Sequence, residues 1–247
     1  MILGPALIVF YQLTRYAVVV GDVPYLANEV RQDLVSGAMN DGGPTHSLPR
    51  LMWGAWYRFV VWIGLAPGAD DSSPTELLEA ITRWNGVFNT LVTAATVVIF
   101  VVVLRRTGVD RWLAFAAGCL AAVAAPVWLY AATAESVALR DLGVVVALGC
   151  AVAIRPLSPP RVAVWLAVTG LATGWMVAIH LASIWLVPVI AIAVLGNRIV
   201  TRPPHCPRRS LLDFAAMEVP VLASWAAIAL TSFVVLSGYT PTGVQTT

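Results

Sequence analysis

Residues 125–148 read APVWLYAATAESVALRDLGVVVAL, an apolar stretch that carries Glu135, Arg140 and Asp141 within seven positions. Ionisable side chains cost several kcal/mol at the depth of a bilayer unless they are paired or hydrated. Neighbours on one helix face lie three or four residues apart, whereas five positions separate Glu135 from Arg140. We therefore expect two apolar helices that break near these charges, at one face of a membrane.

The composition of the whole chain indicates a membrane protein. Of its 247 residues, 59% are hydrophobic and 11% are charged, and the mean hydropathy is +0.82. A soluble domain carries roughly 25% charged residues. Apolar runs approaching about 20 residues recur, as in polytopic α-helical membrane proteins. The three cysteines have neither disulfide nor metal-ligand spacing, so the sequence predicts no metal site.

The apolar runs predict an all-α bundle of about seven spans in a single module of residues 1–247, without a separate soluble domain. The expected spans are 2–20, 84–104, 112–128, 139–154, 162–178, 181–195 and 211–236. A long loop of about residues 21–83 follows the first span. It carries two short helices, Pro24–Met39 and Leu48–Leu65, which we expect to lie next to the membrane.

The second of these helices has two candidate placements. Its tryptophans (Trp53, Trp56 and Trp62) and its arginines (Arg50 and Arg58) favour an interfacial helix that lies along the membrane surface. The alternative is an additional span, which would move the N-terminus to the other side of the membrane.

Arginine-rich short loops mark the cytoplasmic side of a membrane protein. Loops 105–111, 155–161 and 197–209 are rich in arginine, and they alternate correctly if each later span crosses once. The N-terminus is then cytoplasmic, and the loop of residues 21–83 is external. The same arginines suit anionic membrane lipids, and we expect no nucleic-acid partner.

In this topology, polar residues from separate parts of the chain fall at the external face. They are Asp22, His46, Arg50, Glu135, Arg140, Asp141 and His180. Convergence of polar groups at one end of an apolar bundle is the default hypothesis for a binding site.

Several short motifs occur in a recognisable order. They are GD (21–22) after the first span, THSLP (45–49) before the aromatic helix, RWNGVFN (83–89), PVWLYAATAESVAL (126–139), and GLATG (170–174) followed by His180. In these segments the chain resembles the GT-C superfamily of membrane glycosyltransferases. Within it, the chain is similar to the bacterial and eukaryotic group that includes the protein O-mannosyltransferases. The resemblance covers most of residues 1–195.

The resemblance implies a polyprenyl-phosphate sugar donor, such as a mannose donor, and a protein, lipid or glycan acceptor at the outer face of a bacterial plasma membrane. It implies that Asp22 is the catalytic base, at the start of a long external loop with two juxtamembrane helices. The chain departs from the family at Tyr25, where a second acid is frequent, and at Ser47, where a proline often follows the histidine. With fewer spans than its relatives, the chain fits a core module, a truncated member or an inactive one.

Each predicted site residue has a second interpretation that the sequence leaves open. Asp22 is either a general base or the N-cap of the helix that follows. Glu135 either orients a sugar in a pocket or neutralises Arg140 or Arg50. Arg140 either binds the donor phosphate or extends to lipid headgroups, and the same two roles apply to Arg50.

His46 and His180 either contact phosphate or hydroxyl groups of a substrate or form structural hydrogen bonds. The sequence has no Gly-rich phosphate loop, dinucleotide fingerprint or nucleophile elbow, which favours a lipid-linked donor over a nucleotide sugar. The alternative function class is a non-catalytic lipid-binding or transporter-like membrane protein. Transporters often show matching halves, and we find no such internal symmetry.

Overall fold

The computed structural model describes residues 3–13, 23–36, 47–70, 72–124, 127, 130–131, 136–153, 159–200 and 211–237. All regular secondary structure in these residues is helical, so the all-α prediction is confirmed. The helices are α1 (Leu3–Leu13), α2 (Val23–Ser36), α3 (Ser47–Trp62), α4 (Pro74–Arg106), α5 (Arg111–Val123), α7 (Val137–Ala153), α8 (Pro159–Ile179), the 3₁₀ helix η1 (Leu181–Leu186), α9 (Val187–Val200) and α10 (Leu211–Ser237).

Three helical segments are long and apolar enough to cross a bilayer, judged by length and composition. They are Pro74–Arg106, Val162–Ile179 and Glu218–Leu236. A helix of 18 residues is about 27 Å long, close to the roughly 30 Å of a hydrocarbon core. Three further segments, Leu3–Leu13, Arg111–Val123 and Leu181–Gly196, are apolar but shorter.

Helix α4 is the longest element among the described residues and starts earlier than the sequence predicts. Its 33 residues give it a length of about 50 Å, more than one bilayer core requires. A capping box begins it: the Ser73 side chain accepts a hydrogen bond from the Glu76 amide, and the Glu76 carboxylate accepts one from the Ser73 amide. With Pro74 in the first turn, this signal starts the helix at Pro74, so the last part of the loop predicted for residues 21–83 is helical.

Helices α2 and α3 pack against the part of α4 that precedes the predicted span. Trp53 and Tyr57 of α3 are buried between α2 and the α4 residues Leu77 and Ile81. The indole N–H of Trp56 donates to the carbonyl of Trp84 at 2.8 Å. Two of the three tryptophans expected at a membrane interface therefore pack and bond inside this helix cluster.

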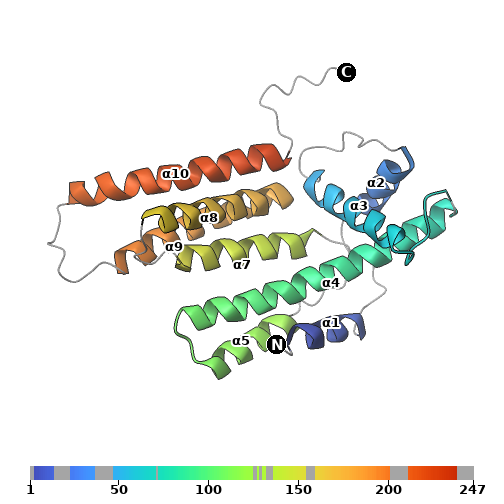
Figure 1. The fold of residues 1–247 in the computed structure, drawn as a ribbon, viewed down its shortest axis with the longest axis horizontal. Coiled ribbons are helices and arrows are strands. Elements are labelled where there is room, and N and C mark those ends of the chain that lie inside the picture. The colour runs from blue at the N-terminus through green and yellow to red at the C-terminus, as the bar shows by residue number, and fades with distance from the viewer. Residues whose placement is uncertain are drawn as a thin grey trace, which may run out of the picture.

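The remaining helices form a layered bundle. Figure 1 shows α10, α8, α7 and α4 side by side in that order, with α1 and α5 on the other side of α4. Helices α4, α7 and α9 end, and α5, α8 and α10 begin, at the same end of the bundle (Figure 1). This is the arrangement expected if each helix crosses once, because the arginine-rich connections then lie on one side. Residues 154–158 and 201–210, which belong to two of these connections, lie outside the described part.

Two glycines allow α8 and α10 to approach closely. A Cβ atom at Gly174 would lie 2.5 Å from the Ala229 carbonyl oxygen and 2.8 Å from the Phe233 amide nitrogen. A Cβ atom at Gly170 would lie 2.7 Å from Cγ2 of Ile228. This small-xxx-small spacing is a frequent contact in membrane helix pairs. The GLATG motif (170–174) thus has a packing role in this fold.

The helices differ from the sequence prediction at three places. Helix α5 ends at Val123 rather than Trp128, because Ala124 has a non-helical ψ of 130°. After α8 the chain becomes extended at His180 (φ −149°, ψ 103°) and continues as η1 before α9. Helix α9 reaches Val200, so Arg198 belongs to a helix and not to the predicted loop.

Candidate functional site

The structure describes three of the six residues predicted to form the site. Arg50, Arg140 and His180 are described, whereas Asp22, His46 and Glu135 lie outside the described residues. The described three come from α3, α7 and the turn after α8.

Arg50 is an interior residue of the α2–α3 pair. Its side chain is 2% exposed, and its guanidinium lies 2.7 Å from Asp33 and 3.5 Å from Glu29, both on α2. Two carboxylates therefore balance one buried cation. We assign Arg50 to the packing of α2 on α3, a role that neither sequence interpretation included.

Arg140 binds the next residue along α7. Nε and Nη2 of Arg140 donate to Oδ1 of Asp141 at 2.8 and 2.6 Å. Both side chains are about a third exposed. One of the two sequence interpretations of Glu135 made it a partner of Arg140; among the described residues, the carboxylate bonded to Arg140 is that of Asp141.

His180 follows the last residue of α8, the helix that packs against α7. Its amide donates to the Met176 carbonyl, which closes the last turn of α8, and its own carbonyl accepts from the Ser183 amide. The indole of Trp175, one turn earlier on α8, donates to the Leu139 carbonyl at 3.2 Å and fixes α8 against the first turns of α7.

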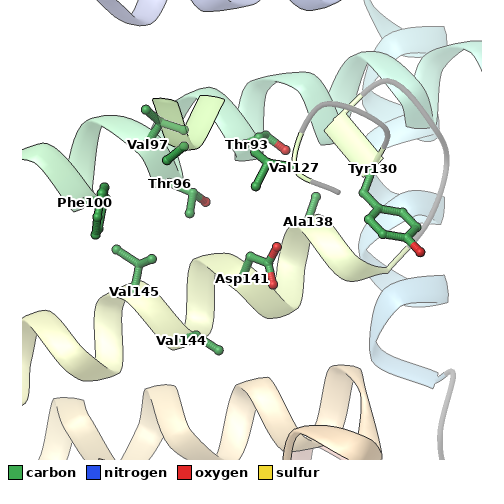
Figure 2. Close-up of a pocket in the computed structure, with 11 residues that line it drawn as sticks. Thr93, Thr96, Val97, Phe100, Val127, Tyr130, Ala138, Asp141, Val144 and Val145 are labelled. Carbon is green, nitrogen blue, oxygen red and sulfur yellow. The ribbon is translucent and has the colours of Figure 1, made fainter. Parts of the chain in front are cut away.

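A pocket of about 240 Å³ opens beside Asp141, between α4 and α7. We call it the Asp141 pocket. Its lining residues are Thr93, Thr96, Val97, Phe100, Ala121, Val127, Tyr130, Ala138, Asp141, Val144 and Val145. Figure 2 shows Asp141 between the two helices, with Tyr130 at one end and Phe100 and Val145 at the other. Polar and apolar side chains therefore line the same pocket, with Asp141 between its two ends (Figure 2).

The α4 wall of the pocket continues a stripe of buried polar residues. Asn85, Asn89, Thr93 and Thr96 are spaced by four, four and three positions, which places them on one helix face. Each is at most 7% exposed. Polar side chains buried in an apolar helix are expensive and commonly face a substrate or ion pathway.

Two members of this stripe have unsatisfied polar atoms. Within the described part of the chain, the Thr93 hydroxyl and both amide atoms of Asn85 have no hydrogen-bond partner. In contrast, the Thr96 hydroxyl donates to the Val92 carbonyl at 2.8 Å. An unsatisfied buried group costs about 1–3 kcal/mol. A ligand or a water molecule in the pocket would remove this cost at Thr93.

Val127 and Tyr130 line the pocket from the segment between α5 and α7, and hydrogen bonds hold this segment at Ala122 and Ala131. The Thr90 hydroxyl lies 2.9 Å from the Ala131 carbonyl oxygen and accepts from the Gln12 amide at 2.8 Å. The Tyr11 hydroxyl donates to the Ala122 carbonyl at 2.9 Å. Tyr11 of α1 and Thr90 of α4 thus hold Ala122 and Ala131, which precede and follow Tyr130 in the chain.

Comparison of the chain with protein-family models, with curated proteins and with solved structures finds no match. The resemblance to the GT-C superfamily accordingly rests on the sequence motifs alone. Two of those motifs have structural roles here: residues 83–89 contain Asn85 and Asn89 of the polar stripe, and residues 170–174 form the contact of α8 with α10.

Sequence reasoning found the Arg140 end of this site but not its pocket. Asp141 was recognised as a charge in an apolar stretch and received no role, while Thr93, Thr96 and Tyr130 were not singled out. The available signal was the spacing of Asn85, Asn89, Thr93 and Thr96 along one face of an apolar helix. Across the described residues, no group of three or more His, Cys, Asp or Glu side chains is arranged to hold a metal ion.

Proposed function

We propose that this chain is a multi-pass membrane glycosyltransferase of the GT-C type. It would transfer a sugar, such as mannose, from a polyprenyl-phosphate donor to a protein, lipid or glycan acceptor at the non-cytoplasmic face. The observation that carries the proposal is the Asp141 pocket, in which Asp141, Thr93 and Tyr130 lie among apolar walls. A sugar on an isoprenoid lipid combines polar and apolar groups in the same way.

The pocket residues have separable roles in this proposal. Tyr130, Thr93 and Asp141 would contact the sugar hydroxyls. The phosphate would lie near Arg140, whose bonds to Asp141 use Nε and Nη2, so that Nη1 would bind the phosphate oxygen. Val97 and Phe100 would contact the first isoprene units.

The chemical step is assigned from the resemblance. Asp22 would accept the proton of an acceptor hydroxyl, whose oxygen forms a bond to the anomeric carbon. The bond between that carbon and the phosphate oxygen breaks, and the lipid phosphate leaves with the electron pair. General-base help of this kind contributes roughly 10²–10⁴ in rate. His46 and Glu135 are proposed to position the sugar or the phosphate.

The proposed topology has seven spans and a cytoplasmic N-terminus in a bacterial plasma membrane. Helices α4, α7 and α9 end, and α5, α8 and α10 begin, at one end of the bundle (Figure 1). The sequences that connect these helices are rich in arginine, which supports a cytoplasmic position for this end. In this orientation Arg140, Asp141 and His180 lie at the external end, and α2 and α3 lie outside the membrane.

The proposal is tested by sugar release from a synthetic polyprenyl-phosphate donor in detergent, measured beside donor binding. Asp22→Asn should abolish turnover and leave donor binding nearly unchanged. Asp110→Asn is the matched control, because Asp110 caps α5 at the arginine-rich end, far along α4 from the pocket. Turnover by Asp22→Asn at the wild-type rate would contradict the mechanism.

The second candidate is a non-catalytic lipid-binding protein, and the mutual neutralisation of Arg140 by Asp141 favours it. A cation that is already paired provides less electrostatic stabilisation to a departing phosphate. Saturable donor binding without sugar release by the wild-type chain would select this candidate.

A further inference from the structure

A second hollow lies at the opposite end of the α4–α7 pair. It has a volume of about 510 Å³ and is formed by α4, α7 and α8. Its lining residues include Val102, Val103, Gly149 and Cys150, together with Arg106 and Trp165. We call it the Arg106 groove. It shares no lining residue with the Asp141 pocket.

The groove opens on the outer surface of the bundle. Val102 is 50% exposed and Trp165 is 37% exposed, although both belong to helices long and apolar enough to cross a membrane. In a bilayer these surfaces would face lipid. The groove walls are apolar, and Arg106 is the one charged residue among the lining residues.

The position of Arg106 along α4 indicates where the membrane surface lies. Arg106 is the last residue of α4, and the Arg111 guanidinium lies 5.2 Å from the ring of Trp112 at the start of α5. Tryptophan and arginine gather at the level of the lipid headgroups. An acyl chain in the groove would therefore have its phosphate at the height of Arg106.

The charge of this end of the bundle selects the headgroup. Between residues 105 and 111, 155 and 161, and 198 and 209 the sequence has nine arginines and one acid, Asp110. Each basic residue near an anionic membrane surface strengthens binding. Arginine also binds phosphate through two parallel hydrogen bonds. The complementary partner has an apolar chain and a net negative head.

We infer that the Arg106 groove is a binding site for an anionic phospholipid, with one acyl chain between α4, α7 and α8 and the phosphate on Arg106. The site is separate from the proposed donor site and does not depend on glycosyl transfer. Bound lipid would fill the space between α4 and α8, which α7 bridges, and would stabilise the bundle at this end.

The test is native mass spectrometry of the full-length chain in detergent, titrated with phosphatidylglycerol and, separately, with phosphatidylcholine. The wild-type chain should retain phosphatidylglycerol roughly tenfold more tightly, as one charge-assisted contact implies. Arg106→Gln should remove this preference. Arg105→Gln is the matched control, because the neighbouring guanidinium donates to the Val109 carbonyl instead of lining the groove. Equal losses in the two variants would overturn the site.

A groove-filling variant tests the acyl chain separately. Val102→Trp adds bulk at a half-exposed position of the groove wall and should reduce phosphatidylglycerol retention about tenfold. Val145→Trp fills the Asp141 pocket instead and should leave phosphatidylglycerol retention unchanged. Soluble glycerol phosphate should not compete. Unchanged retention in Val102→Trp, or full competition by glycerol phosphate, would contradict an acyl chain in the groove.

Discussion

Replacing Thr93 by valine should stabilise the protein and weaken its ligand binding together. The Thr93 side chain is 5% exposed and lines the Asp141 pocket, and its hydroxyl has no partner among the described residues. Valine has nearly the same shape and lacks the hydroxyl. The substitution removes an unsatisfied group whose burial costs about 1–3 kcal/mol.

The expected change in melting temperature follows from this free energy. For a chain of this size, 1 kcal/mol corresponds to about 2–4 °C. Thr93→Val should therefore melt at least about 2 °C above the wild-type chain when no ligand is present. If the hydroxyl contacts the donor, the same variant loses one hydrogen bond of about 0.5–1.5 kcal/mol, which lowers donor affinity by roughly two- to tenfold.

Thr96→Val is the matched control, since Thr96 lines the same pocket and is equally buried, but its hydroxyl is bonded to the Val92 carbonyl. Its melting temperature should not rise. Tryptophan fluorescence during heating in detergent reports both variants. A Thr93→Val chain that melts below Thr96→Val would show that the Thr93 hydroxyl has a partner, and would remove the main reason to expect a polar ligand there.

Three further predictions concern stability. Gly174→Leu should destabilise the bundle by about 1–3 kcal/mol in thermal unfolding, because the added side chain meets backbone atoms of α10. Gly196→Ala is the control and should be neutral or stabilising, because the space around Gly196 is open. Arg50→Met should cost about 3–5 kcal/mol because it leaves Glu29 and Asp33 buried without their cation, and adding Glu29→Gln and Asp33→Asn should recover part of that loss. A hydrogen bond from the Trp112 amide lowers the pKa of the Asp110 carboxyl. The cap of α5 should therefore be intact above about pH 4 and lost as pH falls through the lowered pKa. Hydrogen exchange at the Trp112 and Leu113 amides would detect this loss, and Asp110→Asn should remove its pH dependence.

Hydrophobic patterning was sufficient to predict most of the bundle, because burial and lipid exposure both require long apolar helices. The predicted spans at 139–154, 162–178 and 211–236 match α7, α8 and α10 to within a few residues. The start of α4 was missed, since its polar first turns were assigned to a loop although Ser73 and Glu76 form a capping box. That local signal was present in the sequence, and so were Leu77 and Ile81, which α4 buries against α2 and α3.

The partners of the charged residues could not be predicted in the same way. Arg50 was assigned to a substrate or to lipid, whereas Glu29 and Asp33 of α2 surround it. Which carboxylate reaches which arginine depends on how α2 docks on α3, and residue spacing within one helix contains no such information. The same limit applies to Asp141, whose place in a pocket depends on the distance between α4 and α7.

The most direct measurement is the affinity of the purified chain for a polyprenyl-phosphate sugar before and after the Asp141 pocket is filled. Val145→Trp adds bulk from α7 into that pocket, and Val102→Trp adds the same bulk to the separate Arg106 groove. We expect Val145→Trp to lower donor affinity at least about tenfold and Val102→Trp to leave it within about twofold of the wild-type value. Wild-type affinity in Val145→Trp, or an equal loss in both variants, would contradict a donor site between α4 and α7.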